Sequence, residues 1–290
     1  MPIMEQSDSP RSDDYSGPKS PLRVMQIVEL LASAKGGITL AAMTEAMQIP
    51  KTSLLNHLRV LLTAGYAGQR DGRYTLGPAS LRLGSIIAAD SGVLVASRPV
   101  LVDLVARTDE TAMLATLDEG GTQALYIDVV ESQQDIRYSP RIGSRWPLYC
   151  TGMGRALLAF QDPAFIEVYM ANTELLKPTS LTVTDRARLR RIVDELRSAG
   201  VVVTQGEHTV GAGAVAAPII ERDGRVRHAI GIGIPVARLK SRREHLIAMV
   251  REAARQVAWT LGRDDIAPTA TKADPYGPTR ARRKTTGHAR

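Results

Sequence analysis

Apolar residues recur every three to four positions through three successive segments in the first part of the chain. The first segment begins near Pro21 and ends at Gly36-Gly37. The second covers residues 39–47, and the third covers residues 49–62. This spacing predicts three amphipathic helices. A threonine favours a helix start because its hydroxyl accepts a backbone hydrogen bond there, so we expect Thr39 to cap the second helix.

The pattern then changes to two short runs, residues 66–70 and 73–76, on either side of Asp71-Gly72. An Asp-Gly pair between short strands favours a tight hairpin, because both central residues adopt positive φ. Pro78 suits the first turn of a further helix, expected over residues 78–89. Three helices followed by a two-stranded hairpin are typical of a winged helix-turn-helix.

The rest of the chain alternates helical and strand patterns without a strict repeat. Strands are expected at 111–117, 123–130, 201–205, 214–221 and 226–234. Helices are expected at 93–107, 151–160, 163–171, 184–199 and 241–261. Asp185 can cap the fourth of these helices, and Gly200 can end it. The mixed order predicts an α+β fold for this second part.

Composition and charge narrow the class of protein. The chain has 290 residues, a net charge of +7 and a pI of about 9.7, which permits a polyanionic partner. Its one cysteine, Cys150, excludes an intramolecular disulfide and fits a reducing compartment. There is no apolar run of membrane-spanning length and no secretory leader pattern. We therefore expect a cytoplasmic protein with no membrane partner.

Five segments are expected along the chain. They are a disordered N-terminal tail (1–20), a DNA-binding winged helix-turn-helix (21–77), a linker helix (78–92), a second folded domain (93–263) and a disordered basic tail (264–290). The basic tail carries Arg280, Arg282, Arg283, Lys284 and Arg290. Such a run is more often solvated than specific, and its alternative is non-specific attraction to nucleic acid.

The third helix of the winged motif has a polar side whose residue types suit DNA. Lys51 and Arg59 can neutralise phosphates, and Asn56 can contact an adenine through two hydrogen bonds. Residues 20–83 hold seven basic against three acidic side chains. The predicted DNA-binding residues are Thr39, Lys51, Thr52, Ser53, Asn56, His57, Arg59, Arg70 and Arg73. The alternatives are a winged helix used for protein contacts and, for His57, a solvated helix residue.

A second candidate site lies at residues 147–155, where a loop enters a helix with glycines in its first turn. Gly152 and Gly154 allow another group to approach the backbone, and free N–H groups favour an anion such as a carboxylate. The alternative is tight helix–sheet packing with Thr151 as an ordinary cap. Cys150 is either a wall of this site or a redox sensor.

Several stretches of this sequence resemble the IclR family of transcription regulators. In the first part these are SPLRVMQIVELL, TLAAMTEAMQIPKTSLLNHLRVLLTAGYA and GRYTLGPASLRLG, and in the second RIGSRWPLYCTGMGRALLAF, LRSAGVVVTQGEHTVGAGAVAAPI and AIGIGIP. The resemblance covers about residues 20–262. It implies a GAF-like effector-binding domain, a linker helix and a homodimer or homotetramer. Asn56 departs from the family, which often has arginine there.

The resemblance also implies that the acid group of a small organic effector lies at the start of the helix in residues 147–155. The effector-binding residues that we expect are Tyr126, Leu148, Cys150, Thr151, Gly152, Met153, Ala214, Ile230 and Ile232. Relatives that bind small polar acids have serines matching Gly231 and Gly233 and a cysteine matching Ala214. This chain lacks them, so we hypothesise an aromatic or other organic carboxylate. Arg137, Arg141 and Arg145 either pair with that acid or belong to a solvated loop.

No pattern in the sequence predicts catalysis. The five histidines lack metal spacing, and neither a GxSxG elbow nor a Walker loop is present. We expect no enzyme, no cofactor and no metal site. The sequence therefore predicts a ligand-responsive regulator whose partners are a double-stranded DNA operator and a small organic acid. The alternative is an architectural DNA-bridging protein whose second domain only forms oligomers.

Overall fold

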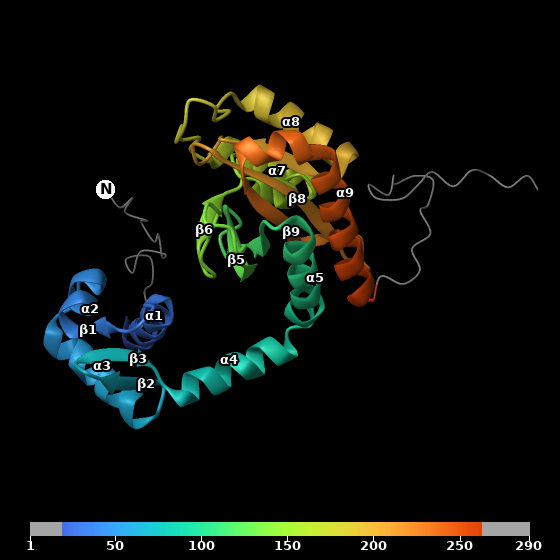
Figure 1. Ribbon diagram of the computed structural model, residues 1–290. Helices are drawn as coiled ribbons and strands as arrows, with labels where there is room; N and C mark the ends of the chain where they lie inside the picture. The colour runs from blue at the N-terminus through green and yellow to red at the C-terminus, as the bar shows by residue number, and fades with distance from the viewer. Residues whose placement is uncertain (1–18, 263–290) are drawn as a thin grey trace, which may run out of the picture. The chain divides into compact units, whose positions relative to one another are not determined.

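The computed structural model describes residues 19–262, which form two compact units, the first ending at Gly92 and the second beginning at Val93 (Figure 1). Both tails expected from composition lie almost wholly outside the described residues. Within residues 19–262, no single helix is long and apolar enough to cross a membrane.

The first unit is a winged helix-turn-helix, as the sequence predicts. Its helices are α1 (Lys19–Ser33), α2 (Leu40–Met47), α3 (Lys51–Thr63) and α4 (Pro78–Asp90), and its strands are β1 (Ile38–Thr39), β2 (Ala67–Arg70) and β3 (Arg73–Leu76). The strands form an antiparallel sheet in the order β1-β3-β2. The two-residue strand β1 was not expected, because its pairing with β3 depends on a segment more than thirty residues away.

Local chemistry explains the turns of this unit. Thr39 caps α2 as expected, with its hydroxyl accepting a hydrogen bond from Ala42 N. Asp71 and Gly72 both have positive φ, 50° and 73°, which is the conformation that a tight hairpin between twisted strands requires. Leu54, Leu58 and Leu61 of α3 are buried together with Ile27, Leu31 and Met43, so one face of each helix builds the core.

The second unit contains a six-stranded antiparallel sheet in the order β6-β5-β4-β9-β8-β7. Its strands are β4 (Thr111–Leu117), β5 (Gln123–Val130), β6 (Arg145–Pro147), β7 (Val202–Gln205), β8 (Ala212–Ile220) and β9 (Val226–Pro235). Its helices are α5 (Gly92–Thr108), α6 (Gly152–Leu158), α7 (Pro163–Asn172), α8 (Arg186–Ala199) and α9 (Val236–Thr260). This mixed architecture confirms the expected α+β class.

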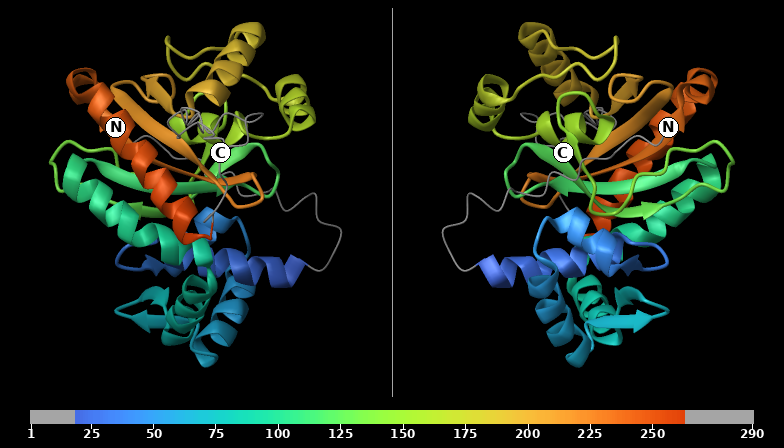
Figure 2. Two further views of the ribbon diagram at one scale, coloured as in Figure 1. Left: turned by 90° about the vertical axis from the view of Figure 1, so that its right-hand side faces the viewer. Right: turned by 90° about the vertical axis from the view of Figure 1, so that its left-hand side faces the viewer.

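Helices α6 and α9 pack on opposite faces of this sheet. Successive residues of a strand point to opposite faces. A Cβ built on Gly213 would lie 2.9 Å from Leu239 of α9, whereas the Cβ of its neighbour Ala214 lies 2.7 Å from the position of a Cβ on Gly152 of α6. The views in Figure 2 show α9, in orange to red, lying across the strands. We call the two surfaces the α6 face and the α9 face.

Candidate DNA-binding and effector-binding sites

The polar side of α3 lies on the surface of the winged unit. Lys51, Thr52, Asn56 and Arg59 are exposed, whereas Ser53 and His57 are half-buried. The buried leucines on the other side of α3 leave this polar face outward. Six of the nine predicted DNA-binding residues therefore come together on one helix.

The start of α3 leaves backbone donors uncapped by a side chain. Pro50 occupies the cap position, and no side chain accepts a hydrogen bond from the first turn. Exposed N–H groups at a helix start carry partial positive charge and attract phosphate. The positive charge of Lys51, in the same turn, adds to this attraction.

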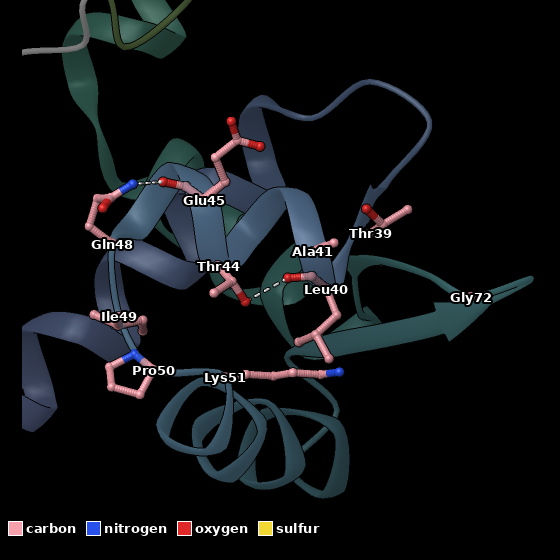
Figure 3. A pocket seen from close by; sticks show the side chains of 10 residues that line it. All are labelled: Thr39, Leu40, Ala41, Thr44, Glu45, Gln48, Ile49, Pro50, Lys51 and Gly72. Atoms are coloured by element: carbon pink, nitrogen blue, oxygen red, sulfur yellow. Dashed lines mark hydrogen bonds between the residues drawn. The ribbon is translucent and has the colours of Figure 1, made fainter.

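A groove of about 880 Å³ lies between α2 and the start of α3 (Figure 3). Its lining residues are Thr39, Leu40, Ala41, Thr44, Glu45, Gln48, Ile49, Pro50, Lys51 and Gly72. Thr39 and Lys51 thus belong to the same surface, together with the tip of the wing. Glu45 also lines the groove, and its carboxylate points away from Lys51 (Figure 3).

The two wing arginines have different surroundings. Arg70 is highly exposed and lies 3.6 Å from the equally exposed carboxylate of Asp71. Arg73 donates a hydrogen bond of 3.1 Å to the carbonyl of Gly37, which ties the wing to the turn before β1. Arg70 is therefore accessible to a DNA backbone, whereas Arg73 also stabilises the contact between the wing and the turn before β1.

In the second unit, close packing accounts for both glycines at the start of α6. A Cβ on Gly154 would lie 2.5 Å from Leu148 Cα, and one on Gly152 would lie 2.7 Å from Ala214 Cβ. Thr151 accepts a hydrogen bond from Gly154 N and donates one to Pro147 O. The packing alternative thus explains this motif without a ligand.

Strand register decides which predicted effector residues share a surface. Ala214 pairs with Gly233, and Ala115 pairs with Tyr126, which puts Ala214 and Tyr126 on the α6 face. Ile230 and Ile232 alternate with Gly231 and Gly233 along β9, so they point to the α9 face and into its core. These two isoleucines therefore do not share a face of the sheet with Ala214 and Tyr126, contrary to what their common assignment implied.

Two residues on the α6 face were not predicted from the sequence. Tyr138 lies against Gly233, with its Cδ1 2.4 Å from where a Cβ on that glycine would be. Thr204 is buried and pairs with Ala214 on the neighbouring strand. Nothing in the local sequence indicates either contact. The contact of Tyr138 with Gly233 joins distant segments of the chain, and that of Thr204 with Ala214 depends on the strand register.

Cys150 is buried beside Leu148 and Met153, which are also buried. Burial raises the pKa of the Cys150 thiol to about 12, although the hydrogen bond with Tyr149 and the charge of Arg155 act in the opposite direction. A thiol that stays protonated and inaccessible is a poor nucleophile. The structure therefore favours Cys150 as a wall of the site at residues 147–155 over Cys150 as a redox sensor.

A buried ion pair joins α6 to the loop after β7. Arg155, only 3% exposed, donates to both carboxylate oxygens of Glu207, the first at 2.8 Å, and to Tyr149 O at 2.7 Å. The carbonyl of Glu207 in turn accepts hydrogen bonds from Thr179 and Thr182. We call this network the Arg155 latch, because it joins three segments that are far apart in the chain.

The arginines of the 131–145 segment have local partners. Arg137 lies beside the carboxylate of Glu131 and donates to Gln134 O, and Arg145 pairs with Glu119. Arg141 also has a partner. These contacts favour the interpretation as a solvated loop over direct pairing with an effector.

Within residues 19–262, no group of three or more His, Cys, Asp or Glu side chains could hold a metal ion. The fold and surfaces of this chain define a class: transcriptional regulators that combine a winged helix with a separate α+β domain. Residues 88–259, more than half of the chain, match the family described as bacterial transcriptional regulator IclR, C-terminal. The chain belongs to the IclR family.

Comparisons with individual proteins agree with this assignment. The HTH-type transcriptional regulator KipR of Bacillus subtilis is 29% identical, over 84% of this chain and 97% of its own length. The crystal structure of the Thermotoga maritima IclR is 25% identical, with a TM-score of 0.70 over 84% of this chain and 99% of that one. An IclR homolog from Microbacterium hydrocarbonoxydans, solved with 4-hydroxybenzoate, is 22% identical, with a TM-score of 0.73 over 83% and 98%. The last comparison concerns the fold alone.

Proposed function

We propose that this chain binds a DNA operator through α3, as a homodimer or homotetramer, and responds to a small organic carboxylate held on the α6 face. The outward polar face of α3, with an uncapped helix start beside Lys51, is the observation that carries the proposal. In a winged helix-turn-helix this helix enters the major groove. Selecting bound sequences from random duplex DNA with the full-length chain tests it, because a regulator enriches one motif.

The chain offers an apolar surface for pairing with a second copy. Leu81, Leu83, Ile86 and Ile87 of α4 are 42–63% exposed. Large apolar side chains that remain exposed in a row favour burial against a partner. We propose that α4 supplies part of a homodimer contact. Sedimentation of Ile86→Glu/Ile87→Glu should show a smaller species than the wild-type chain, and an unchanged mass would remove α4 from the interface.

The effector that fits best is an aromatic carboxylate. Tyr138 and Met113 lie beside Gly233, and Tyr126 lies on the same face of the sheet, two strands away on β5. Flat aromatic ligands pack well on such rings. The Microbacterium neighbour solved with 4-hydroxybenzoate supports this choice of class.

Calorimetry with 4-hydroxybenzoate, benzoate, pyruvate and glucose tests the effector class. We expect heat with at least one aromatic acid and none with glucose. If pyruvate gives heat and neither aromatic acid does, the effector belongs to the small polar acids rather than to the aromatic acids.

A further inference from the structure

A second buried ion pair of this unit lies outside the surfaces described above. Glu110, 1% exposed, begins the segment that leads into β4. Both of its carboxylate oxygens accept hydrogen bonds of 2.7 Å from Arg238, in the first turn of α9, and Arg242 lies 3.6 Å away, one turn later. We call this cluster the Glu110 junction.

The Glu110 junction connects α9 to two other segments. Arg242 donates a hydrogen bond of 2.8 Å to the carbonyl of Thr108, the last residue of α5. Arg238 donates one of 2.9 Å to the carbonyl of Ile136, in the loop between β5 and β6. The same loop is also joined to the end of α5 directly, since Ser132 Oγ donates to Asp109 O at 2.6 Å.

The loop that Arg238 contacts carries Tyr138 onto the α6 face. Ile136 lies two residues before Tyr138, whose ring touches Gly233 and lies near Met113. A ligand that takes the place of the Tyr138 ring would therefore move a residue only two positions from the carbonyl that Arg238 holds. A bidentate pair with a carboxylate that is almost wholly buried resists breaking, because it would leave that charge without a partner.

We infer that the Glu110 junction is the coupling element of this regulator, which passes movement of Tyr138 to the last turn of α5. Helix α5 follows α4 directly in the chain, so its position bears on the DNA-binding unit through covalent continuity. This inference rests on the proposed function for its meaning, since it describes how effector binding reaches the first unit. Arg238 is in this account a positioning residue, which touches neither ligand nor DNA.

Hydrogen exchange on the full-length chain tests the junction without ligand or DNA. Tyr138→Ala, which frees the loop tip, should raise exchange of amides 104–110 by about fivefold or more, since they lie at the connected helix end. In an Arg238→Gln background, the effect of Tyr138→Ala there should be much smaller, since only the hydrogen bond from Ser132 to Asp109 O still joins the loop to the end of α5. Arg227→Gln is the matched control, because Arg227 pairs with Glu221 and Asp223 on a remote turn. In that background the effect of Tyr138→Ala should persist.

The inference is overturned if Tyr138→Ala leaves amides 104–110 unchanged, or if its effect is equally large with Arg238→Gln. Where Arg238→Gln does not fold, Arg238→Lys replaces it, because lysine keeps a charge beside Glu110 but lacks the forked guanidinium that also reaches Ile136 O. This outcome is independent of the proposed function, which fails instead if no DNA motif is selected or no acid binds.

Discussion

At the scale of single residues, α3 divides its side chains between a core and a surface. Leu54, Leu58 and Leu61 are buried, so Asn56 and Arg59 must face outward. The sequence pattern was sufficient for this division, because a helix repeats every 3.6 residues whatever it packs against. Whether each outward residue contacts a base or a phosphate stays a prediction.

Asn56 and Lys51 should respond differently to truncation. Asn56→Ala should relax base preference at one position by about 1–3 kcal/mol, because an amide can contact an adenine edge through two hydrogen bonds. Lys51→Ala should weaken binding to all sequences about equally, since a phosphate carries no sequence information. Competition binding against single-base variants of the selected motif measures both. Equal, sequence-independent losses would show that Asn56 is not a base reader.

Gly233 should tolerate a side chain only when Tyr138 is removed. A Cβ at residue 233 would lie 2.4 Å from the Tyr138 ring and 2.9 Å from Met113 Cε, so the ring must move. Overpacking of this kind typically costs about 1–3 kcal/mol. Urea unfolding followed by tryptophan fluorescence reports on the second unit, which contains both tryptophans, Trp146 and Trp259.

Tyr138→Ala should restore most of the stability that Gly233→Ala loses. Additive losses in the double variant would mean that the two residues do not share this space.

At the scale of elements, the strands of the second unit were predicted better than its helix boundaries. The residues of β4 and β5 match the prediction, because alternation and flanking turns are local signals. Helix α9 begins at Val236, directly after Pro235, rather than near residue 241. Strand β6 was not predicted at all. Three residues give too short a pattern, and β6 is fixed by its pairing with β5.

The candidate sites also contain some features that local sequence signals predict and others that depend on long-range packing. The outward face of α3 and the cap of α6 follow from local chemistry, and both were expected. Ile230 and Ile232 lie on the face opposite to Ala214, because isoleucines and glycines alternate along β9 without a polar residue to mark either face, and only packing decides which set faces α6. The contact of Tyr138 with Gly233 joins a loop and a strand about 95 positions apart, for which no sequence periodicity exists.

The Arg155 latch should be costly to break from one side. Arg155→Met leaves the Glu207 carboxylate, 14% exposed, without its bidentate partner. Loss of one partner of a buried pair typically costs about 3–5 kcal/mol. Arg107→Met is the matched control, since Arg107 and its partners Asp103 and Glu252 are about half exposed and their loss should change stability by about 1 kcal/mol or less. Similar losses in both variants, measured by urea unfolding, would contradict the special role of the latch.

At the scale of the whole molecule, two half-buried histidines make stability depend on pH. Burial lowers the pKa of His208, and it lowers the pKa of His228 despite the opposing effect of its hydrogen bond to Glu221. Below the ordinary histidine pKa of 6.5, the unfolded chain therefore binds protons that the folded chain does not. The free energy of unfolding should fall as the pH falls through this range.

Melting temperatures at about pH 7.5 and about pH 5.5 measure this dependence, since the range spans the ordinary histidine pKa. We expect a lower value at the acidic pH, and a smaller difference for His208→Gln, even if that variant is less stable at both. A difference as large in His208→Gln as in the wild-type chain would assign the pH dependence to other groups.

The proposed regulation requires both units of the chain. The first unit supplies the outward polar face of α3. The second unit supplies the α6 face and the Glu110 junction. A regulator requires that a ligand change DNA affinity, whereas an architectural protein requires only that both units bind and assemble.

The most direct test is DNA binding by the full-length chain to its selected motif, with and without 4-hydroxybenzoate and benzoate. We expect at least one acid to change the apparent dissociation constant by about fivefold or more, in the range usual for coupled sites. A glucose control should leave it unchanged. Tight binding to one motif that none of a panel of organic acids alters would contradict the account and favour the architectural alternative.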